Sequence, residues 1–248
     1  MLQEVRLLHA GDCLIDASEL VTGTPEGTLA RVPIWMYLLH TDDALLLVDT
    51  GMPRECIGNE RIFAAEEDGD HILPQMSEGD TVDRALARHG YAISDIDALI
   101  STHWHFDHAG GNRLFRGKPV LVHPAEVESA RGEEEIPFWV DLGLDFRPAQ
   151  DGDAPARGVT LLHTPGHTMG HLSLLLEPQG SQPLLLTIDA TYTARNWTED
   201  LPGAMVDPQL GMRSVARLKE IARASSAAVF FGHDAAQAQE ERWRSLAG

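Results

Sequence analysis

Four metal-binding side chains crowd into one six-residue stretch of this sequence: His103, His105, Asp107 and His108. They follow a short apolar segment, residues 96–100, whose pattern predicts a strand. Without a cation, so many imidazole and carboxylate groups in one place would lose hydration, and protonated imidazoles would repel one another. A divalent cation removes both costs. The stretch therefore indicates a metal site, and it requires a fold that presents a loop at the end of a strand.

The spacing within this loop suits two adjacent metals. His103 and His105 are two residues apart, so in extended backbone they point the same way. Asp107 and His108 come where the chain is expected to turn into a helix, and the glycines at 110–111 permit tight curvature there. One loop thus presents two pairs of ligands, but it cannot complete both coordination shells.

The remaining ligands are expected just beyond other apolar strands, where α/β enzymes gather functional groups. Three candidates have this context: His167 in a Thr-Pro-Gly-His turn, Asp189, and His233 after a Phe-Phe-Gly segment. His163 and His171 flank the first of these, and either a supporting role or an ordinary place in a strand explains them. The other histidines of the chain have no partner cluster.

The rest of the chain alternates strands and helices, with no linker that would divide residues 1–248 into separate domains. Residues 55–76 lack a regular pattern and are read as a long excursion of the kind that often forms a binding loop. Ser77 is expected to cap a helix that Gly90 ends. Strands are predicted at 32–39, 44–48, 96–100, 119–122, 159–162, 172–176, 184–188 and 227–231, and further helices at 125–130, 207–224 and 234–246.

Composition narrows the class of partner. The 248 residues are 43% hydrophobic and 23% charged, which is ordinary for a globular protein. A net charge of −19 disfavours nucleic acid and anionic lipid, so a small neutral substrate fits better. Cys13 and Cys56 are too few for a disulfide framework, and a metal site here must use imidazole and carboxylate. The first residues do not read as a signal peptide and no apolar run matches a membrane span, so we expect a cytoplasmic protein, as a monomer or homodimer.

These motifs resemble the metallo-β-lactamase superfamily, and most closely its quorum-quenching N-acyl-homoserine lactonases of the autoinducer-inactivation type. The His-x-His-x-Asp-His signature alone identifies only the superfamily. Two further stretches resemble the lactonases in particular: residues 186–192 (Leu-Thr-Ile-Asp-Ala-Thr-Tyr) and 230–234 (Phe-Phe-Gly-His-Asp). Further matching stretches lie at 32–39, 47–53, 72–74, 103–112 and 164–167. The resemblance implies an α/β fold, a four-layer αβ/βα sandwich with the metal site at one edge of two sheets.

The resemblance also implies a dinuclear site. Seven side chains would hold the two divalent ions: His103, His105 and His167 the first, Asp107, His108 and His233 the second, and Asp189 both, together with a hydroxide. Asp49 matches an aspartate of the superfamily and would orient the histidine loop. Nitrogen and oxygen ligands suit zinc best here, with cobalt, iron and manganese as further options.

The reaction that this implies is hydrolysis of an N-acyl-homoserine lactone, by attack of the bridging hydroxide on the lactone carbonyl. Tyr192 would donate a hydrogen bond to the carbonyl oxygen, and Asp107 would pass a proton to the leaving ring oxygen. Phe63 and Phe106 match positions where the family has aromatic residues near its substrate, and they would form a wall for the acyl chain. Trp35 is a further candidate for this wall, but ordinary core packing explains it better.

Other hydrolases share the signature. A glyoxalase-II-type thioesterase is the main alternative, but the stretch 234–248 is short and holds only two arginines, where that family adds a basic helical segment. A β-lactamase would have no place for Asp189 as a bridging ligand, and the net charge opposes a nuclease. A non-catalytic metal-binding function is a further alternative. The acidic runs at 66–70 and 133–135 match no role in the family and are read as solvated faces.

Overall fold

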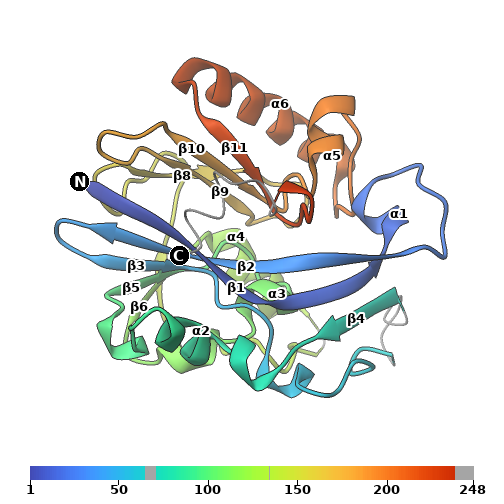
Figure 1. Ribbon diagram of the computed structural model, residues 1–248, viewed down its shortest axis with the longest axis horizontal. Helices are drawn as coiled ribbons and strands as arrows, with labels where there is room; N and C mark the ends of the chain where they lie inside the picture. The colour runs from blue at the N-terminus through green and yellow to red at the C-terminus, as the bar shows by residue number, and fades with distance from the viewer. Residues whose placement is uncertain (65–70, 134, 238–248) are drawn as a thin grey trace.

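Two β-sheets pack face to face, and helices cover the outer face of each (Figure 1). The computed structural model describes residues 1–64, 71–133 and 135–237. The larger sheet has the strand order β4-β1-β2-β3-β5-β6-β7 and the smaller one β11-β10-β9-β8. This is the αβ/βα sandwich that the motifs predicted.

The larger sheet joins an antiparallel half to a parallel half. Its strands are β1 (Leu2–Asp16), β2 (Leu29–Thr41), β3 (Leu45–Val48), β4 (Ile72–Gln75), β5 (Ala98–Ile100), β6 (Pro119–Val122) and β7 (Asp145–Pro148). Strands β4, β1, β2 and β3 pair antiparallel, whereas β3, β5, β6 and β7 pair in parallel. Because parallel strands end at the same edge, the loops after β3 and β5 leave the sheet side by side.

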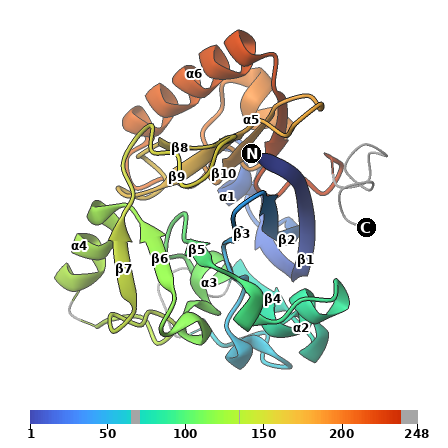
Figure 2. The same ribbon diagram turned by 90° about the vertical axis from the view of Figure 1, so that its left-hand side faces the viewer.

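The smaller sheet and the helices complete the layers. Strands β8 (Val159–His163), β9 (Leu172–Leu176) and β10 (Leu184–Ile188) are antiparallel, and β11 (Ala228–Phe231) is parallel to β10. The helices are α1 (Ala17–Leu20), α2 (Val82–Arg88), α3 (Phe106–Ala109), α4 (Pro124–Gly132), α5 (Ala194–Glu199) and α6 (Pro208–Ser225). Figure 2 shows α6 outside the smaller sheet, while α2 and α4 lie on the side of the larger one.

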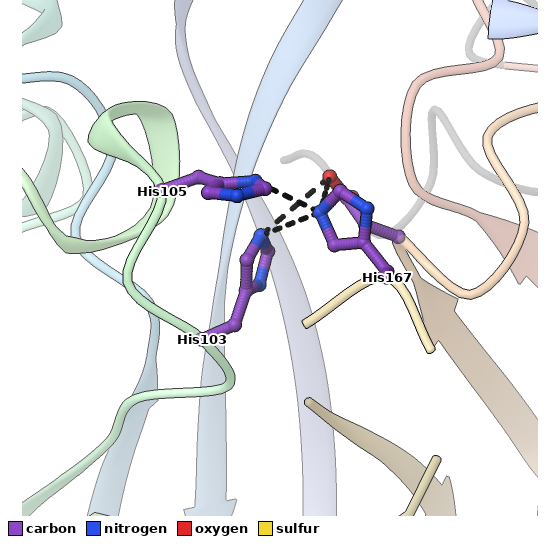
Figure 3. Close-up of side chains that lie close together, drawn as sticks. His103, His105 and His167 are labelled. Atoms are coloured by element: carbon purple, nitrogen blue, oxygen red, sulfur yellow. Dashed lines mark hydrogen bonds and ion pairs between the residues drawn. The ribbon is translucent and has the colours of Figure 1, made fainter. Parts of the chain in front are cut away.

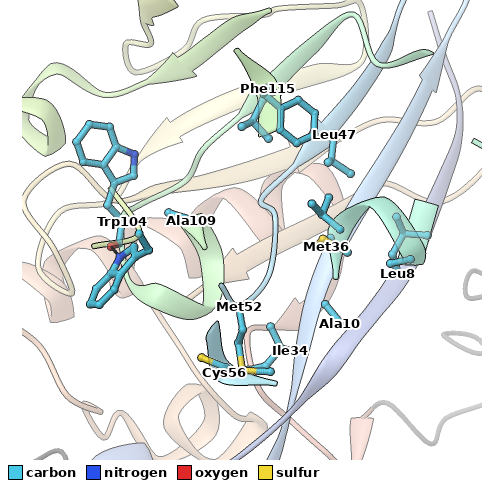
Figure 4. Packing of buried hydrophobic residues seen from close by; sticks show 14 of the residues in the cluster. Leu8, Ala10, Ile34, Met36, Leu47, Met52, Cys56, Trp104, Ala109 and Phe115 are labelled. Atoms are coloured by element: carbon cyan, nitrogen blue, oxygen red, sulfur yellow. Dashed lines mark hydrogen bonds between the residues drawn. The ribbon is translucent and has the colours of Figure 1, made fainter. Parts of the chain in front are cut away.

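The strand pleat divides the core between the layers. Alternate residues of β2 enter different clusters, as a period of two requires. Ile34 and Met36 pack with the residues beneath the larger sheet's helices (Figure 4), whereas Trp35 and Tyr37 pack between the sheets. A third cluster joins α6 to β8 and β10. Three apolar interfaces therefore hold four layers together.

Most predicted elements are present with nearly the expected bounds, but the prediction for Ser77 was wrong. Its backbone N–H and its hydroxyl both donate to Asp80, at 2.8 and 2.6 Å, and this capping box closes a short 3-10 helix, Glu78–Asp80. The backbone is extended again at Thr81, which is the N-cap residue of α2. A single capping signal was thus assigned to the wrong helix.

Three strands were not predicted: β1, β4 and β7. The long strand β1 is hidden because its pairing register shifts between His9 and Asp12, at Gly11, whose φ is 90°. A bulge of this kind breaks the alternation by which a strand is recognised. Residues 238–246 of the last predicted helix, and residues 66–70 and 134 of the acidic runs, lie outside the described residues. In the described part of the chain, no helix is long and apolar enough to cross a membrane.

Candidate metal centre

Loops at one edge of the two sheets bring the predicted ligands together. His103 and His105 lie in the loop after β5, and Asp107 and His108 lie in the short helix α3 that follows it. His167, Asp189 and His233 follow β8, β10 and β11. Figure 3 shows His103, His105 and His167 pointing at one another from two of these loops. All seven side chains are buried except that of His105.

The ligand atoms fall into two groups, within each of which they lie no more than 4.8 Å apart. The first group is His103, His105, His167 and Asp189, and the second is Asp107, His108 and His233. In the first, His167 Nε2 lies 3.2 Å from His103 Nε2 and 2.9 Å from His105 Nδ1. In the second, Asp107 Oδ2 lies 3.6 Å from His108 Nε2 and 3.5 Å from His233 Nε2. The structure thus brings together every predicted ligand in two adjacent clusters.

The Asp189 carboxylate faces both groups. Its Oδ2 lies 3.3 Å from His167 Nε2 and 3.7 Å from His103 Nε2. Its Oδ1 lies 3.2 Å from His233 Nε2 and 3.4 Å from His108 Nε2. Burial by itself would raise the pKa of Asp189, but the His108 and His233 imidazoles hold that pKa well below its usual range. One anionic group therefore stands between the clusters, with one oxygen toward each.

Backbone carbonyls orient the two histidine ligands of the smaller sheet. His167 Nδ1 donates to the carbonyl of Ala204, and His233 Nδ1 donates to that of Pro33, each at 2.9 Å. Since a carbonyl only accepts, each ring keeps a proton on Nδ1, and its Nε2 faces the centre.

Side chains orient the ligands of the larger sheet. The Asp49 carboxylate accepts the backbone N–H of Thr102, its hydroxyl, and His108 Nδ1–H, at 2.8, 2.8 and 2.9 Å. Because the Thr102 hydroxyl hydrogen goes to Asp49, its oxygen accepts from His103 Nδ1, 3.1 Å away. Burial raises the pKa of Asp49, and the hydrogen bonds from His108 and Thr102 oppose that rise.

These hydrogen bonds leave nitrogen lone pairs facing one another. Burial, followed by the nearby imidazoles, lowers the pKa of His103 and of His167 well below the ordinary value, so both rings are neutral. Among the described residues, buried His108 Nε2 and Asp189 Oδ1 have no hydrogen-bond partner. Such buried atoms are costly unless something satisfies them, and a divalent cation would do so. The donor set of imidazole and carboxylate therefore fits transition metal ions such as zinc.

The backbone is strained where two of the loops leave their strands. Asp49 at the end of β3 has φ 59°, and Ile188 at the end of β10 has φ 49°. A β-branched residue rarely adopts this left-handed conformation. Strain of this kind persists only where the surroundings fix the backbone, and here it directly precedes Asp189.

A cavity of about 510 Å³ opens over the centre. Its polar end includes His105, Asp107, Asp189 and Tyr192, and its walls are largely apolar. Apolar lining residues include Ile15, Leu20, Val32, Phe106, Trp139 and Met205. The Tyr192 hydroxyl lies 3.2 Å from His167 Nδ1 and donates to the Ala204 carbonyl at 3.3 Å.

The predicted aromatic wall is only partly at the cavity. Phe106 lines it, while Phe63 packs behind Phe106 with ring centroids 4.4 Å apart. Trp35 lies in the core between the sheets, as packing alone explains. Trp139 lines the cavity and contacts Phe63 edge-on at 5.8 Å, but it was not predicted. It comes from an irregular stretch, in which no periodicity indicates where a side chain points.

Two more buried polar residues lie near the ligands: His171, for which the sequence left a supporting role and a place in a strand both open, and Glu126, which it did not single out. His171 Nε2 accepts the backbone N–H of Asp189 at 3.1 Å, and burial lowers the pKa of His171 to about 3, so the ring stays neutral. Glu126 on α4 is buried and accepts hydrogen bonds from two ligand-bearing loops. No sequence signal separates Glu126 from Glu128, the exposed acidic residue two positions further along the same helix.

Comparison with known proteins agrees with this geometry. Residues 29–233 match the model of the metallo-beta-lactamase superfamily. An N-acyl homoserine lactonase from Bacillus sp is 41% identical over 236 residues, covering 95% of this chain and 94% of the relative. A solved N-acyl homoserine lactone hydrolase, with the product N-hexanoyl-L-homoserine at its catalytic metal center, has a TM-score of 0.92 at 39% identity and covers 96% of this chain and 95% of its own. A mutant of B. thuringiensis AiiA with N-decanoyl-L-homoserine at its active site has the same TM-score, identity and coverage.

Proposed function

The chain belongs to the metallo-β-lactamase superfamily, and on that premise we propose that it is a metal-dependent N-acyl-homoserine lactonase, with residues 1–248 as its single domain. The observation that carries the proposal is the convergence of seven ligand side chains beneath a cavity with apolar walls. Similar proteins support it, because two solved relatives hold N-acyl-homoserine products at their active sites. The substrate class would be neutral lactones with an acyl tail.

The proposed centre holds two divalent ions, with zinc as the first candidate. His103, His105 and His167 would bind one ion, Asp107, His108 and His233 the other, and Asp189 both. When bound, two such ions supply a Lewis acid for the carbonyl oxygen and an activated water as nucleophile. Asp49 would hold the histidine loop beneath them through its contacts with Thr102 and His108.

Tyr192 would stabilise the negative charge that develops on the carbonyl oxygen. Burial, and then the charges of Asp189 and Asp107, raise the pKa of Tyr192 well above the ordinary value, so its hydroxyl keeps its hydrogen. The hydroxyl borders the cavity and donates to the Ala204 carbonyl. Rotation of this O–H toward a substrate oxygen would make it an oxyanion donor.

Asp107 would deliver the proton that the leaving ring oxygen needs. Its carboxylate lines the cavity, and its side chain is 13% exposed, more than that of Asp189. A carboxyl group that contacts both solvent and the reacting atoms is placed to take a proton from the attacking water and release it to the alkoxide.

The apolar walls would receive the acyl chain. Phe106 and Trp139 form one side, with Phe63 packed behind them. The product of ring opening carries a carboxylate, and the net charge of −19 would favour its departure.

Ring opening by the metal-loaded protein tests the proposal. Proton release would be followed with N-acyl-homoserine lactones of six to ten acyl carbons, for the wild type, His105→Ala and Tyr192→Phe. We expect rapid opening that His105→Ala abolishes and that Tyr192→Phe slows by about 100–1000-fold, the cost of losing an oxyanion donor. No opening by protein that holds two metals per chain would refute lactonase activity, and hydrolysis of S-lactoylglutathione by that protein would point to a thioesterase.

A further inference from the structure

The Glu126 side chain connects the two loops that carry His103, His105 and His167. Glu126 lies on α4 and is 5% exposed. Its Oε1 accepts the backbone N–H of Trp104 at 2.9 Å. Its Oε2 accepts the Thr168 hydroxyl at 2.8 Å and the Gly170 backbone N–H at 3.1 Å.

Two of the donors to Glu126 lie next to the predicted metal ligands in the sequence. Trp104 stands between His103 and His105, in the loop that follows β5 of the larger sheet. Thr168 directly follows His167, in the loop after β8 of the smaller sheet. One carboxylate therefore joins ligand-bearing loops from both sheets, with a separate oxygen for each loop.

Hydrogen bonds from these three donors stabilise the buried Glu126 carboxylate. Among the described residues, no basic side chain or histidine lies within ion-pair distance of Glu126. A buried carboxylate is costly unless hydrogen bonds satisfy it, and bonds to a charged acceptor are stronger than neutral ones. Movement of either loop would remove a donor from Glu126, so the carboxylate resists their separation.

Gly170 allows its loop to approach Glu126 closely. A Cβ atom on Gly170 would lie 2.6 Å from Glu126 Cβ and 2.7 Å from its Oε2. Since real Cβ atoms do not approach so closely, only glycine lets this loop lie against α4. Glu126 does not line the cavity over the centre and belongs to neither ligand group, so it would act on the ligands only through their loops.

We propose that Glu126 is a positioning residue that sets the spacing of His103 and His105 relative to His167, and thereby the affinity and geometry of the first metal position. The inference rests on the metal centre of the proposed function, but not on the lactone as substrate. Its test therefore uses metal binding, which can be measured whatever the protein hydrolyses.

The test compares Glu126→Gln with Glu128→Gln, a matched change at an exposed position of the same helix. The amide keeps the shape of the carboxylate but turns one acceptor oxygen into a donor that faces N–H and O–H groups. In Co²⁺ titrations against a competing chelator, we expect Glu126→Gln to weaken one of the two binding steps about 10–100-fold, the usual effect of losing a group that orients ligands. We also expect its visible Co²⁺ absorption band to shift, and Glu128→Gln to match the wild type.

A second variant separates positioning from folding. Thr168→Val keeps the side-chain shape and removes only the hydroxyl donor, so we expect a smaller loss of Co²⁺ affinity in the same step. Thr168→Val decides the question if Glu126→Gln does not fold. Wild-type Co²⁺ affinity and an unshifted band in the folded variants would overturn the inference. Failure of the wild type to open lactones, with Co²⁺ affinity lowered in the variants, would overturn the proposed substrate and leave the role of Glu126 in place.

Discussion

The two sheets supply the centre in different ways. The larger sheet contributes four ligands from one loop, residues 103–108, whereas the smaller sheet contributes three from the ends of three strands. The supports differ as well. Side chains of Asp49 and Thr102 orient His108 and His103 of the first set, while backbone carbonyls orient His167 and His233. The direct supports of His103 and His108 are therefore side chains, which a substitution can remove, whereas those of His167 and His233 are backbone carbonyls, which it cannot.

Of the substitutions that compare the two sheets, Asp189→Asn should have the largest effect, because Asp189 faces both groups of ligands. An amide lacks the charge and one of the two acceptor oxygens. We expect kcat/KM for lactone opening to fall by more than about 100-fold, beyond the loss caused by removing a group that only supports a ligand. Metal content, measured on the same preparation, should fall with it. Asp200→Asn, at an exposed position, is the control, and retention of both metals and activity by Asp189→Asn would contradict the bridging role.

Asp49→Asn tests the dependence of the larger sheet on side-chain support. The substitution removes an acceptor of His108 Nδ1–H or of Thr102 without touching the cavity. We expect metal affinity to fall about 10–100-fold. Chelator competition measures the change, and Asp42→Asn at the surface serves as the matched control. Equal affinities for the two variants would show that the histidine loop does not need Asp49.

His171→Leu tests the smaller sheet and should have the smallest effect. It leaves the backbone N–H of Asp189 without its acceptor, which costs about 1–3 kcal/mol in the free energy of unfolding. His171→Gln offers an amide oxygen to the same N–H and should recover part of that loss. Denaturant unfolding of the metal-free proteins measures both. If His171→Leu lowered metal affinity more than Asp49→Asn does, the proposed difference between the sheets would be reversed.

The same difference explains what the sequence could predict. The loop at residues 103–108 is local, so its spacing indicates a metal site directly. His167, Asp189 and His233 were found because each follows a recognisable apolar strand. Glu126 and Trp139 could not be found in this way, since their burial depends on packing between segments far apart in the sequence.

Strand prediction failed for a related reason. The strands of the smaller sheet are short apolar runs, and all four begin and end within one residue of the predicted bounds. In β1, Gly11 interrupts the alternation, and the strand is apparent only through its pairing with β2. Local composition therefore predicted the strands of the smaller sheet better than the bulged strand of the larger one.

Metal stoichiometry tests most directly whether both sheets build one dinuclear centre. Zinc-loaded wild type, His105→Ala and His233→Ala would be freed of excess metal and analysed by mass spectrometry for metal per chain. His105 comes from the larger sheet and the first group, and His233 from the smaller sheet and the second. We expect two ions in the wild type and a loss of at least one in each variant. A single ion in the wild type, or two retained after His233→Ala, would contradict the account.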